Sequence, residues 1–388
     1  MTGKTAGLHL GVALTGAGWH PGAWRAAHAR PAELLTAQYW ADLVREAESG
    51  LLDFVTFEDR FTVFDRGAPD DSTDLVAGQL DSVLVASRVA PLTRHIGLIP
   101  TAVVTHTEPF HLSKAIATLD YVSGGRAGVR LRVSGDPREA ALFGRRRVDD
   151  QHAGELLHEA ADYATALGLL WDSWEDDAEI RDNTTGRFID RDKLHYADFA
   201  GEFFSVRGPS ITPRPPQGRP PIAALAHSGR AHRFVGASAD LGFITPDDEN
   251  TAAAIVADIT GDRHDDAPVR LVVDLAVTIG DTDADAHRRA DELNSLSAQP
   301  YSSDAEIVVG SASTVADRIA QWASLDGIDG VRLRPAALPD DLTAITRSVV
   351  PILQRRGLFR KSYAESTLRD RLGLPRPTNL FTEKVSAS

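Results

Sequence analysis

Short apolar runs alternate with longer amphipathic stretches along most of this chain. The runs are rich in Val, Ile and Leu and are bounded by Gly, Pro, Asp or Thr, which is typical of buried strands. They predict eight strands, at residues 8–14, 54–58, 95–101, 127–133, 221–226, 241–245, 269–277 and 329–334.

The stretches between these runs have helical spacing. In residues 33–50 apolar side chains recur at four-residue spacing before a glycine ends the pattern: Leu35, Tyr39, Leu43, Ala47 and Gly50. Residues 311–327 place three apolar side chains on one face of an expected helix: Val315, Ile319 and Trp322. Alternating strands and helices indicate a parallel sheet. Eight such units favour a (β/α)8 TIM barrel over a doubly wound sheet, because no Gly-x-Gly-x-x-Gly follows the first strand.

The interval from 135 to 220 is too long for a bare loop. It begins with a helical pattern at 154–180 and continues with Gly, Pro and aromatic residues, where we expect a hairpin around 201–208. We therefore predict one barrel domain over residues 1–388, with a helix and an ordered insertion after strand four and a C-terminal extension. Insertions at barrel ends commonly cover a site.

Composition narrows the class of partner. The net charge of −14 disfavours nucleic acid, whose binding needs a basic face. No apolar run is long enough for a membrane span, and no secretion signal is recognisable, so we expect a cytoplasmic protein. The absence of cysteine excludes disulfides and thiolate metal sites. A small-molecule substrate is the expected partner.

Several phrases resemble the bacterial-luciferase-like flavin-dependent monooxygenases, most closely their nitrilotriacetate monooxygenase-type branch. The phrases lie at residues 16–25, 39–59, 105–128, 169–178, 203–209 with 213–220, and 349–363 with 367–374, and include GAGWHPGAWR, THTEPFHLSKAIATLDYVSGGRAG and LLWDSWEDDA. The resemblance implies a (β/α)8 barrel that uses FMN reduced elsewhere and dioxygen to oxidise a small organic substrate. It also implies a separate flavin reductase as partner and a homodimer.

The resemblance also indicates cofactor-binding residues at the strand ends, where barrel enzymes carry their sites. Asp59 falls on the acidic residue beside the flavin ring, but it could instead cap a helix or pair with its neighbour. The hydroxyl of Thr101 could bond an edge of the flavin or only cap the following turn. Ser134 keeps the terminal serine of the strand-four pattern. Ser228, followed by Gly229, matches the serine at the FMN phosphate before a helix, although a plain N-cap also selects serine.

Three histidines lie near the expected site. His20 follows the first strand, and His106 and His111 follow the third, with His111 in the first turn of the next helix. An imidazole can move a proton in such chemistry, so His20 and His111 are the catalytic candidates, against the alternative that each only holds a loop carbonyl. The histidine spacing does not suggest zinc, and we predict no metal site.

Arg130 and Arg132 stand two positions apart in the fourth predicted strand. Residues at this spacing share a face, so both arginines should point into the barrel lumen with Ser134. Buried guanidinium groups need carboxylate partners, and Glu58 and Asp274 are the candidates. Arg132 could hold an anionic flavin or substrate, or both arginines could belong to an ion network without a ligand.

Two departures from the family keep other functions open. The family usually reads Trp-Asn-Val-Val-Thr-Ser over residues 129–134, and it carries an Arg-Tyr pair where this chain has Leu156 and Leu157. One alternative is a deazaflavin-dependent oxidoreductase that transfers hydride without oxygen. The other is a cofactor-less barrel that acts as a binding or structural subunit.

Overall fold

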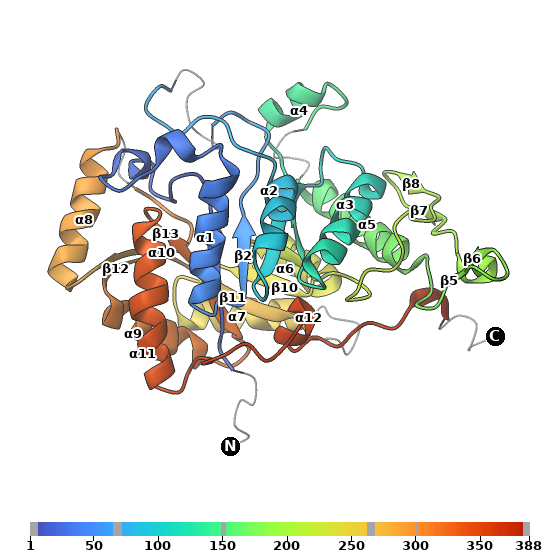
Figure 1. Cartoon of the computed structure of the whole chain (residues 1–388). Coiled ribbons are helices and arrows are strands. Elements are labelled where there is room, and N and C mark those ends of the chain that lie inside the picture. The colour runs from blue at the N-terminus through green and yellow to red at the C-terminus, as the bar shows by residue number, and fades with distance from the viewer. Residues whose placement is uncertain (1–6, 65–71, 149–152, 262–267, 299–300, 383–388) are drawn as a thin grey trace.

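A closed parallel barrel forms the centre of the molecule (Figure 1). The computed structural model describes residues 7–64, 72–148, 153–261, 268–298 and 301–382. All eight predicted strands form, and pairing of β10 with β11 closes them into a barrel. The predicted (β/α)8 fold is therefore confirmed. The barrel strands are β1 (His9–Leu14), β2 (Phe54–Phe57), β3 (Gly97–Val103), β4 (Val129–Arg132), β9 (Ile222–Ala226), β10 (Leu241–Ile244), β11 (Arg270–Gly280) and β13 (Gly330–Pro335).

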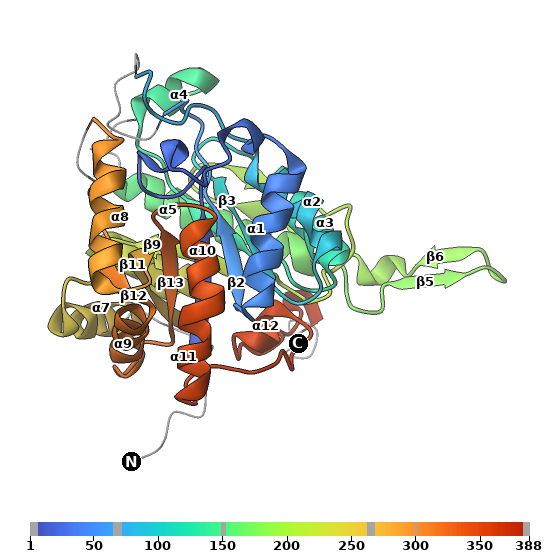
Figure 2. The ribbon, with the colours of Figure 1, turned by 60° about the vertical axis from the view of Figure 1, so that its left-hand side comes forward.

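The helices surround the barrel (Figure 2). Those that follow the first four strands and lead to the insertion are α1 (Ala37–Ser49), α2 (Ser82–Val89), α3 (Pro109–Ser123), α4 (Pro137–Phe143) and α5 (Ala153–Asp172). The later ones are α6 (Gly229–Ser238), α7 (Glu249–Gly261), α8 (Asp283–Ser295), α9 (Ala312–Ala323), α10 (Asp340–Ala344), α11 (Val350–Arg355) and α12 (Leu368–Arg371). Among the described residues, no helix combines the length and the apolar character that a membrane span needs.

The first helix begins later than its apolar spacing predicts. Thr36 is the N-cap, and its hydroxyl accepts a hydrogen bond from the backbone N–H of Tyr39. Leu35 therefore precedes α1, and its side chain is 63% exposed instead of buried. The Thr36 hydroxyl satisfies a backbone N–H that has no partner within the first helical turn. This capping hydrogen bond fixes the start of α1 at Ala37, although burial of the Leu35 side chain would favour an earlier start.

Two hairpins lie between α5 and β9. The pair β7 (Phe199–Ala200) and β8 (Ser205–Val206) is antiparallel and lies at the predicted hairpin. The pair β5 (Glu179–Asp182) and β6 (Arg187–Ile189) has no counterpart in the predicted elements and projects from the body (Figure 2). A further strand, β12 (Glu306–Ser311), pairs with the outer half of β11, which continues beyond the barrel.

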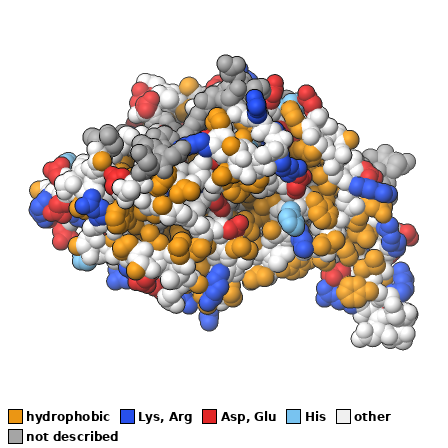
Figure 3. All heavy atoms as spheres, turned by 90° about the horizontal axis from the view of Figure 1, so that it is seen from above, with side chains coloured by type: hydrophobic (Ala, Val, Ile, Leu, Met, Phe, Trp, Pro, Cys, Tyr) orange, Lys and Arg blue, Asp and Glu red, His pale blue; other side chains and the backbone are white. Residues whose placement is uncertain are grey.

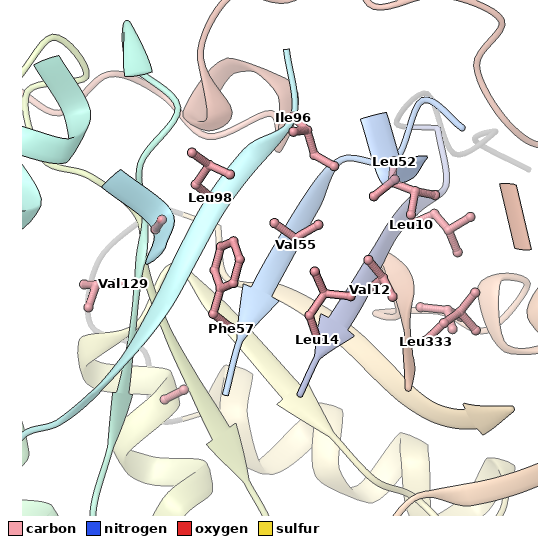
Figure 4. Close-up of a cluster of buried hydrophobic side chains, with 14 of the residues drawn as sticks. Leu10, Val12, Leu14, Leu52, Val55, Phe57, Ile96, Leu98, Val129 and Leu333 are labelled. Carbon is pink, nitrogen blue, oxygen red and sulfur yellow. The ribbon is translucent and has the colours of Figure 1, made fainter. Parts of the chain in front are cut away.

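The side chains of the barrel strands point alternately outward and inward. Outward-pointing residues pack under the helices, as Leu10, Val12 and Leu14 of β1 do beside Val55 and Phe57 of β2 (Figure 4). Inward-pointing residues form a second, smaller apolar cluster at the amino-terminal end of the lumen, where α12 packs against the strands: Phe54, Ile99, Ala223, Leu241, Phe243, Val272, Leu368, Leu372 and Leu374. This alternation decides which side chains reach the mouth.

An ion network lies in the lumen next to this apolar cluster. Asp274 accepts two hydrogen bonds from Arg332, at 2.6 and 2.5 Å, and also binds Arg334. The Arg332 guanidinium carbon lies 3.7 Å from the ring centre of Phe243. Burial acts to raise the pKa of Asp274, but the two arginines outweigh burial and hold that pKa below its ordinary value. One carboxylate therefore serves two buried cations.

We expect Asp274→Asn to lower the free energy of unfolding by about 3 kcal/mol, because Arg332 and Arg334 lose the buried carboxylate that they share, and the remaining anions are Asp304 for Arg334 and Glu58, 3.7 Å from Arg332. Urea denaturation followed by circular dichroism measures the change. Asp317→Asn is the control, because its pair with Arg356 is exposed and should matter little. Equal midpoints for wild type and Asp274→Asn would contradict a structural role for the network.

Candidate active site at the barrel mouth

A cavity of about 540 Å³ opens at the carboxyl ends of the barrel strands. This volume falls in the range typical of small-molecule sites. Figure 3 shows this end from above, with hydrophobic side chains among charged side chains of both signs. The cavity is lined by the loop after β1, the end of β2, the segment that precedes α2, the end of β4 and the segment before β12. The lining residues are 15–21, Trp24, residues 58–60, Leu75, Val76, Gly78, Gln79, Arg132, Tyr301 and Ser302.

The two arginines of β4 have different partners. Arg130 is buried and binds Glu58, as the alternation predicts, and its Nε donates to the Thr101 hydroxyl at 2.8 Å. Burial lowers the pKa of Arg130 to about 10, although Glu58 opposes the shift. Arg132 pairs with Glu139 of α4, with 2.9 Å between Nη1 and Oε1. Arg132 and Glu58 line the cavity, so this charge network reaches the site.

The prediction that Asp274 pairs with the β4 arginines is wrong. Asp274 lies on β11, opposite Arg332 of β13 in register, and β13 is the strand beside it. Strand β4 lies between β3 and β9, away from β11 in the strand order. The neighbouring strand therefore supplies the cations that Asp274 binds.

Asp59 lies in the cavity wall with its carboxylate held by three donors. Oδ2 accepts from the backbone N–H of Ser82, at the start of α2, at 2.9 Å. Oδ1 accepts from the backbone N–H of Arg60 and from the side-chain amide of Gln79. Burial raises the pKa of Asp59, although these donors oppose the shift. The N-cap of α2 is Asp81, so Asp59 is not the capping residue, but it accepts the free N–H of the first residue of α2. These contacts fix its carboxylate in the cavity wall, and flavin contact by Asp59 stays a prediction.

Thr101 and Ser134 support the site from outside the cavity lining. Thr101 lies within β3 instead of ending it, and its hydroxyl is used by Arg130. Ser134 is buried, its N–H donates to the Thr105 hydroxyl at 2.9 Å, and its own hydroxyl accepts from the N–H of Asp136. Both hydroxyl groups therefore accept hydrogen bonds from other residues of the protein. Flavin contact by Thr101 or Ser134 stays a prediction.

Ser228 and Gly229 form an open helix start. Ser228 is the N-cap of α6, but its hydroxyl makes no capping hydrogen bond and its side chain is exposed. A methyl group added at Gly229 would meet no heavy atom within 4 Å. The first N–H groups of α6 and the serine hydroxyl can therefore meet an anion from outside, as the phosphate assignment requires.

His20 has both ring nitrogens engaged. Nδ1 accepts from the N–H of Gly22 at 3.0 Å, so Nε2 carries the proton and donates to Asn294 at 3.1 Å. Burial lowers the pKa of His20, and the bond to Asn294 opposes the shift only in part. His20 lines the cavity as a neutral side chain that joins the β1 loop to α8. Its catalytic role stays a prediction.

The other two histidines lie elsewhere. His111 is exposed in the first turn of α3 and is not among the cavity residues, so its catalytic role also stays a prediction. His106 is buried and stacks on Phe143 at 5.0 Å. It lines a separate cavity of about 270 Å³ with Arg146 and Tyr163. Within the described ranges, no three His, Asp or Glu side chains come together as a metal site would require.

Several ionisable residues that lie behind or beside the cavity lining are not predicted from the sequence. They are Arg332, Arg334, Asp304, Glu139 and His227. One signal was available, because Gly-Val-Arg-Leu-Arg occurs at both 128–132 and 330–334. The repeat marks a second strand with two inward arginines. Nothing comparable marks Asp304 or Glu139, whose partners depend on the fold.

Comparison with known proteins agrees with this geometry. The luciferase-like monooxygenase family matches residues 17–327. The chain is 29% identical to N-acetyl-S-(2-succino)cysteine monooxygenase of Bacillus subtilis (strain 168), over 99% of this chain and 100% of that protein. It is 29% identical to nitrilotriacetate monooxygenase component A of Aminobacter aminovorans, over 97% of this chain and 98% of that protein. A crystal structure of long-chain alkane monooxygenase is similar with a TM-score of 0.85 and 23% identity, over 95% of this chain and 96% of that one.

The chain therefore belongs to the luciferase-like monooxygenase family. The predicted resemblance to the nitrilotriacetate monooxygenase-type branch is confirmed. The fold and the mouth cavity thus belong to a flavin-dependent oxidoreductase of the monooxygenase class.

We expect His20→Gln to reduce the acid sensitivity of the fold. The pKa of His20 is lower in the folded chain than in the unfolded chain, so the unfolded state binds more protons as pH falls through about 6.5. Wild type should lose stability below that pH, and the loss should be smaller in the variant. Thermal unfolding midpoints between pH 7.5 and 5 measure the difference, and parallel curves would contradict the lowered pKa.

Proposed function

We propose that this chain is a monooxygenase that uses reduced FMN and dioxygen to oxidise a small organic substrate, with the flavin reduced by a separate flavin reductase. The observation that carries the proposal is the charged cavity at the mouth of a luciferase-like barrel. The matched relatives include a component A, a name that indicates an enzyme of more than one component, and this chain covers nearly all of that protein.

The residues at the mouth fit a flavin mononucleotide in two respects. The uncapped start of α6 offers a hydroxyl and free N–H groups to a phosphate. The carboxylate side chains of Glu58 and Asp59 line the cavity, where they can accept hydrogen bonds from the N–H groups of the ring. Oε1 of Glu58 is buried and lies 3.7 Å from Nη1 of Arg332, so the network holds this side chain in place. We therefore assign the ring to the cavity and the phosphate to Ser228.

The side chains around the cavity then have separate tasks. When bound and reduced, FMN supplies the two electrons with which dioxygen reacts. Trp19 and Trp24 give the cavity an apolar wall that excludes water. Asp59, held by three donors, orients the polar edge of the ring. His20 fixes the β1 loop, and Arg132 supplies a cation for an anionic group of the ligand.

Carboxylate-bearing molecules are the substrate class to test first. Two relatives that match the chain from end to end are named for N-acetyl-S-(2-succino)cysteine and nitrilotriacetate. Arg132 in the cavity wall is a suitable partner for a carboxylate, because a guanidinium group can form two parallel hydrogen bonds with it.

We expect Ser228→Ala and Arg132→Ala each to weaken FMN binding about tenfold, the cost of one charge-assisted hydrogen bond. Anaerobic titration with oxidised and reduced FMN, followed by flavin fluorescence or absorbance, measures the affinity. Arg347→Ala is the matched control, because Arg347 is exposed and pairs with Glu46. Melting curves establish that each variant is folded. Unchanged affinity in both site variants would show that the site is placed wrongly.

We expect substrate oxidation only when a flavin reductase, NADH, FMN and dioxygen are all present. The assay follows oxygen consumption and product mass with N-acetyl-S-(2-succino)cysteine and nitrilotriacetate as probes. Turnover with a reduced deazaflavin in the absence of oxygen would favour the deazaflavin enzyme instead. Failure to bind FMN in either redox state would favour the cofactor-less barrel.

A further inference from the structure

His227 lies at the point where β9 reaches the barrel mouth. Ala223 of β9 belongs to the lumen cluster and Leu225 packs against it, so the alternation along the strand turns His227, two residues further on, to the same side. About half of its side chain is exposed. His227 also directly precedes Ser228, which the proposed function places at the FMN phosphate.

The end of the lumen ion network faces this imidazole. Asp304 Oδ2 lies 3.5 Å from His227 Nδ1. Arg334 binds the same Asp304 carboxylate and, with its Nε, Asp274 at 3.0 Å. Arg334 also lies over the ring of Trp19 in the cavity wall, 4.6 Å from the ring centre. A continuous chain of contacts therefore joins His227 to the lumen and to the cavity.

Four charged groups act electrostatically on the imidazole: Asp304, Arg334, Asp274 and Arg130. Burial lowers the pKa of His227. The two carboxylates oppose this shift and the two guanidinium groups reinforce it, so the net effect is a pKa below the ordinary value. His227 is then neutral at pH 7, with a basic nitrogen available.

The contacts also indicate which nitrogen is available. A carboxylate at Nδ1 favours the tautomer with hydrogen on Nδ1. The lone pair of Nε2 is then free for a ligand. Asp304 itself is held by Arg334, so the imidazole has a fixed neighbour on one side. About half of the His227 side chain is exposed beyond the end of β9. His227 does not itself line the cavity of about 540 Å³, and Arg334, over the ring of Trp19, connects it to the cavity wall.

We propose that His227 is a proton-transfer residue of the mouth site that contacts the bound flavin or its substrate, and that Asp304 is its positioning residue. This inference rests on the proposed function. In the forward step Nε2 accepts a proton from an N–H or O–H group of the ligand, and that group keeps the electron pair of the broken bond. The imidazolium is stabilised by Asp304 and later returns the proton to an oxygen atom derived from dioxygen, so the histidine ends unchanged.

The first test is a titration of the imidazole by NMR. In protein labelled with ¹⁵N-histidine, the signal absent from His227→Gln identifies His227. We expect Asp304→Asn to lower the pKa of His227 by about half a unit or more, because it removes the anion that opposes the shift. Addition of oxidised FMN should move the His227 signal. A His227 signal that is unchanged by both would overturn the proposal without reference to activity.

The second test is the pH dependence of oxidation of protein-bound reduced FMN by dioxygen in stopped flow. We expect His227→Gln to slow the reaction at least about tenfold and to remove one ionisation from the pH profile, with FMN affinity changed less than threefold. His158→Gln is the matched control, because His158 of α5 forms an exposed pair with Glu202, in the turn between β7 and β8, with 3.6 Å between Nδ1 and the carboxylate. The control should keep both the rate and the profile.

The outcomes separate this proposal from the function on which it rests. If wild type binds and oxidises reduced FMN but His227→Gln retains the rate and the pH profile, only the role of His227 is overturned. If the variant loses FMN affinity tenfold and keeps its rate, His227 is a binding residue and the proton-transfer role is overturned. If wild type does not bind FMN, the proposed function itself fails.

Discussion

The buried pairing of arginine with carboxylate inside the barrel is the constraint on which the mouth depends. Arg130, Arg332 and Arg334 are almost completely removed from solvent, and each would be costly without an anion. Asp274 serves two of them and Glu58 the third. Because these pairs lie between the apolar lumen cluster and the cavity, they fix the side chains at the mouth and carry charge to its edge.

The network gives this barrel a mouth that differs from the family pattern. Where the resemblance leads one to expect a neutral polar side chain in strand four, Arg130 and Glu58 form an ion pair, and Arg132 reaches α4 through Glu139. Membership of the luciferase-like monooxygenase family shows the class of enzyme. Under the proposed function, Glu58, Asp59 and the start of α6 would supply the polar contacts to the flavin in place of that side chain.

The sequence predicted all eight barrel strands because buried parallel strands are short apolar runs between amphipathic helices. It also indicated that Arg130 faces the lumen and named Glu58 as one of two candidate partners for the arginines of strand four, because alternation alone decides which residues face the lumen, and Glu58 does bind Arg130. It assigned Asp274 wrongly because that pairing depends on the strand order, which places β13 beside β11. His227 was missed because its importance comes from Asp304, which lies 77 positions away in the chain and is brought near only by the fold.

Under the proposed function, a flavin occupies the mouth of this barrel above the lumen ion network. A crystal structure of the chain grown with FMN tests that claim most directly. We predict the flavin ring in the cavity beside Asp59 and Glu58, with the phosphate at the start of α6 and the Arg130–Glu58 pair retained. Flavin bound elsewhere, or a phosphate that does not contact the Ser228 region, would contradict the account.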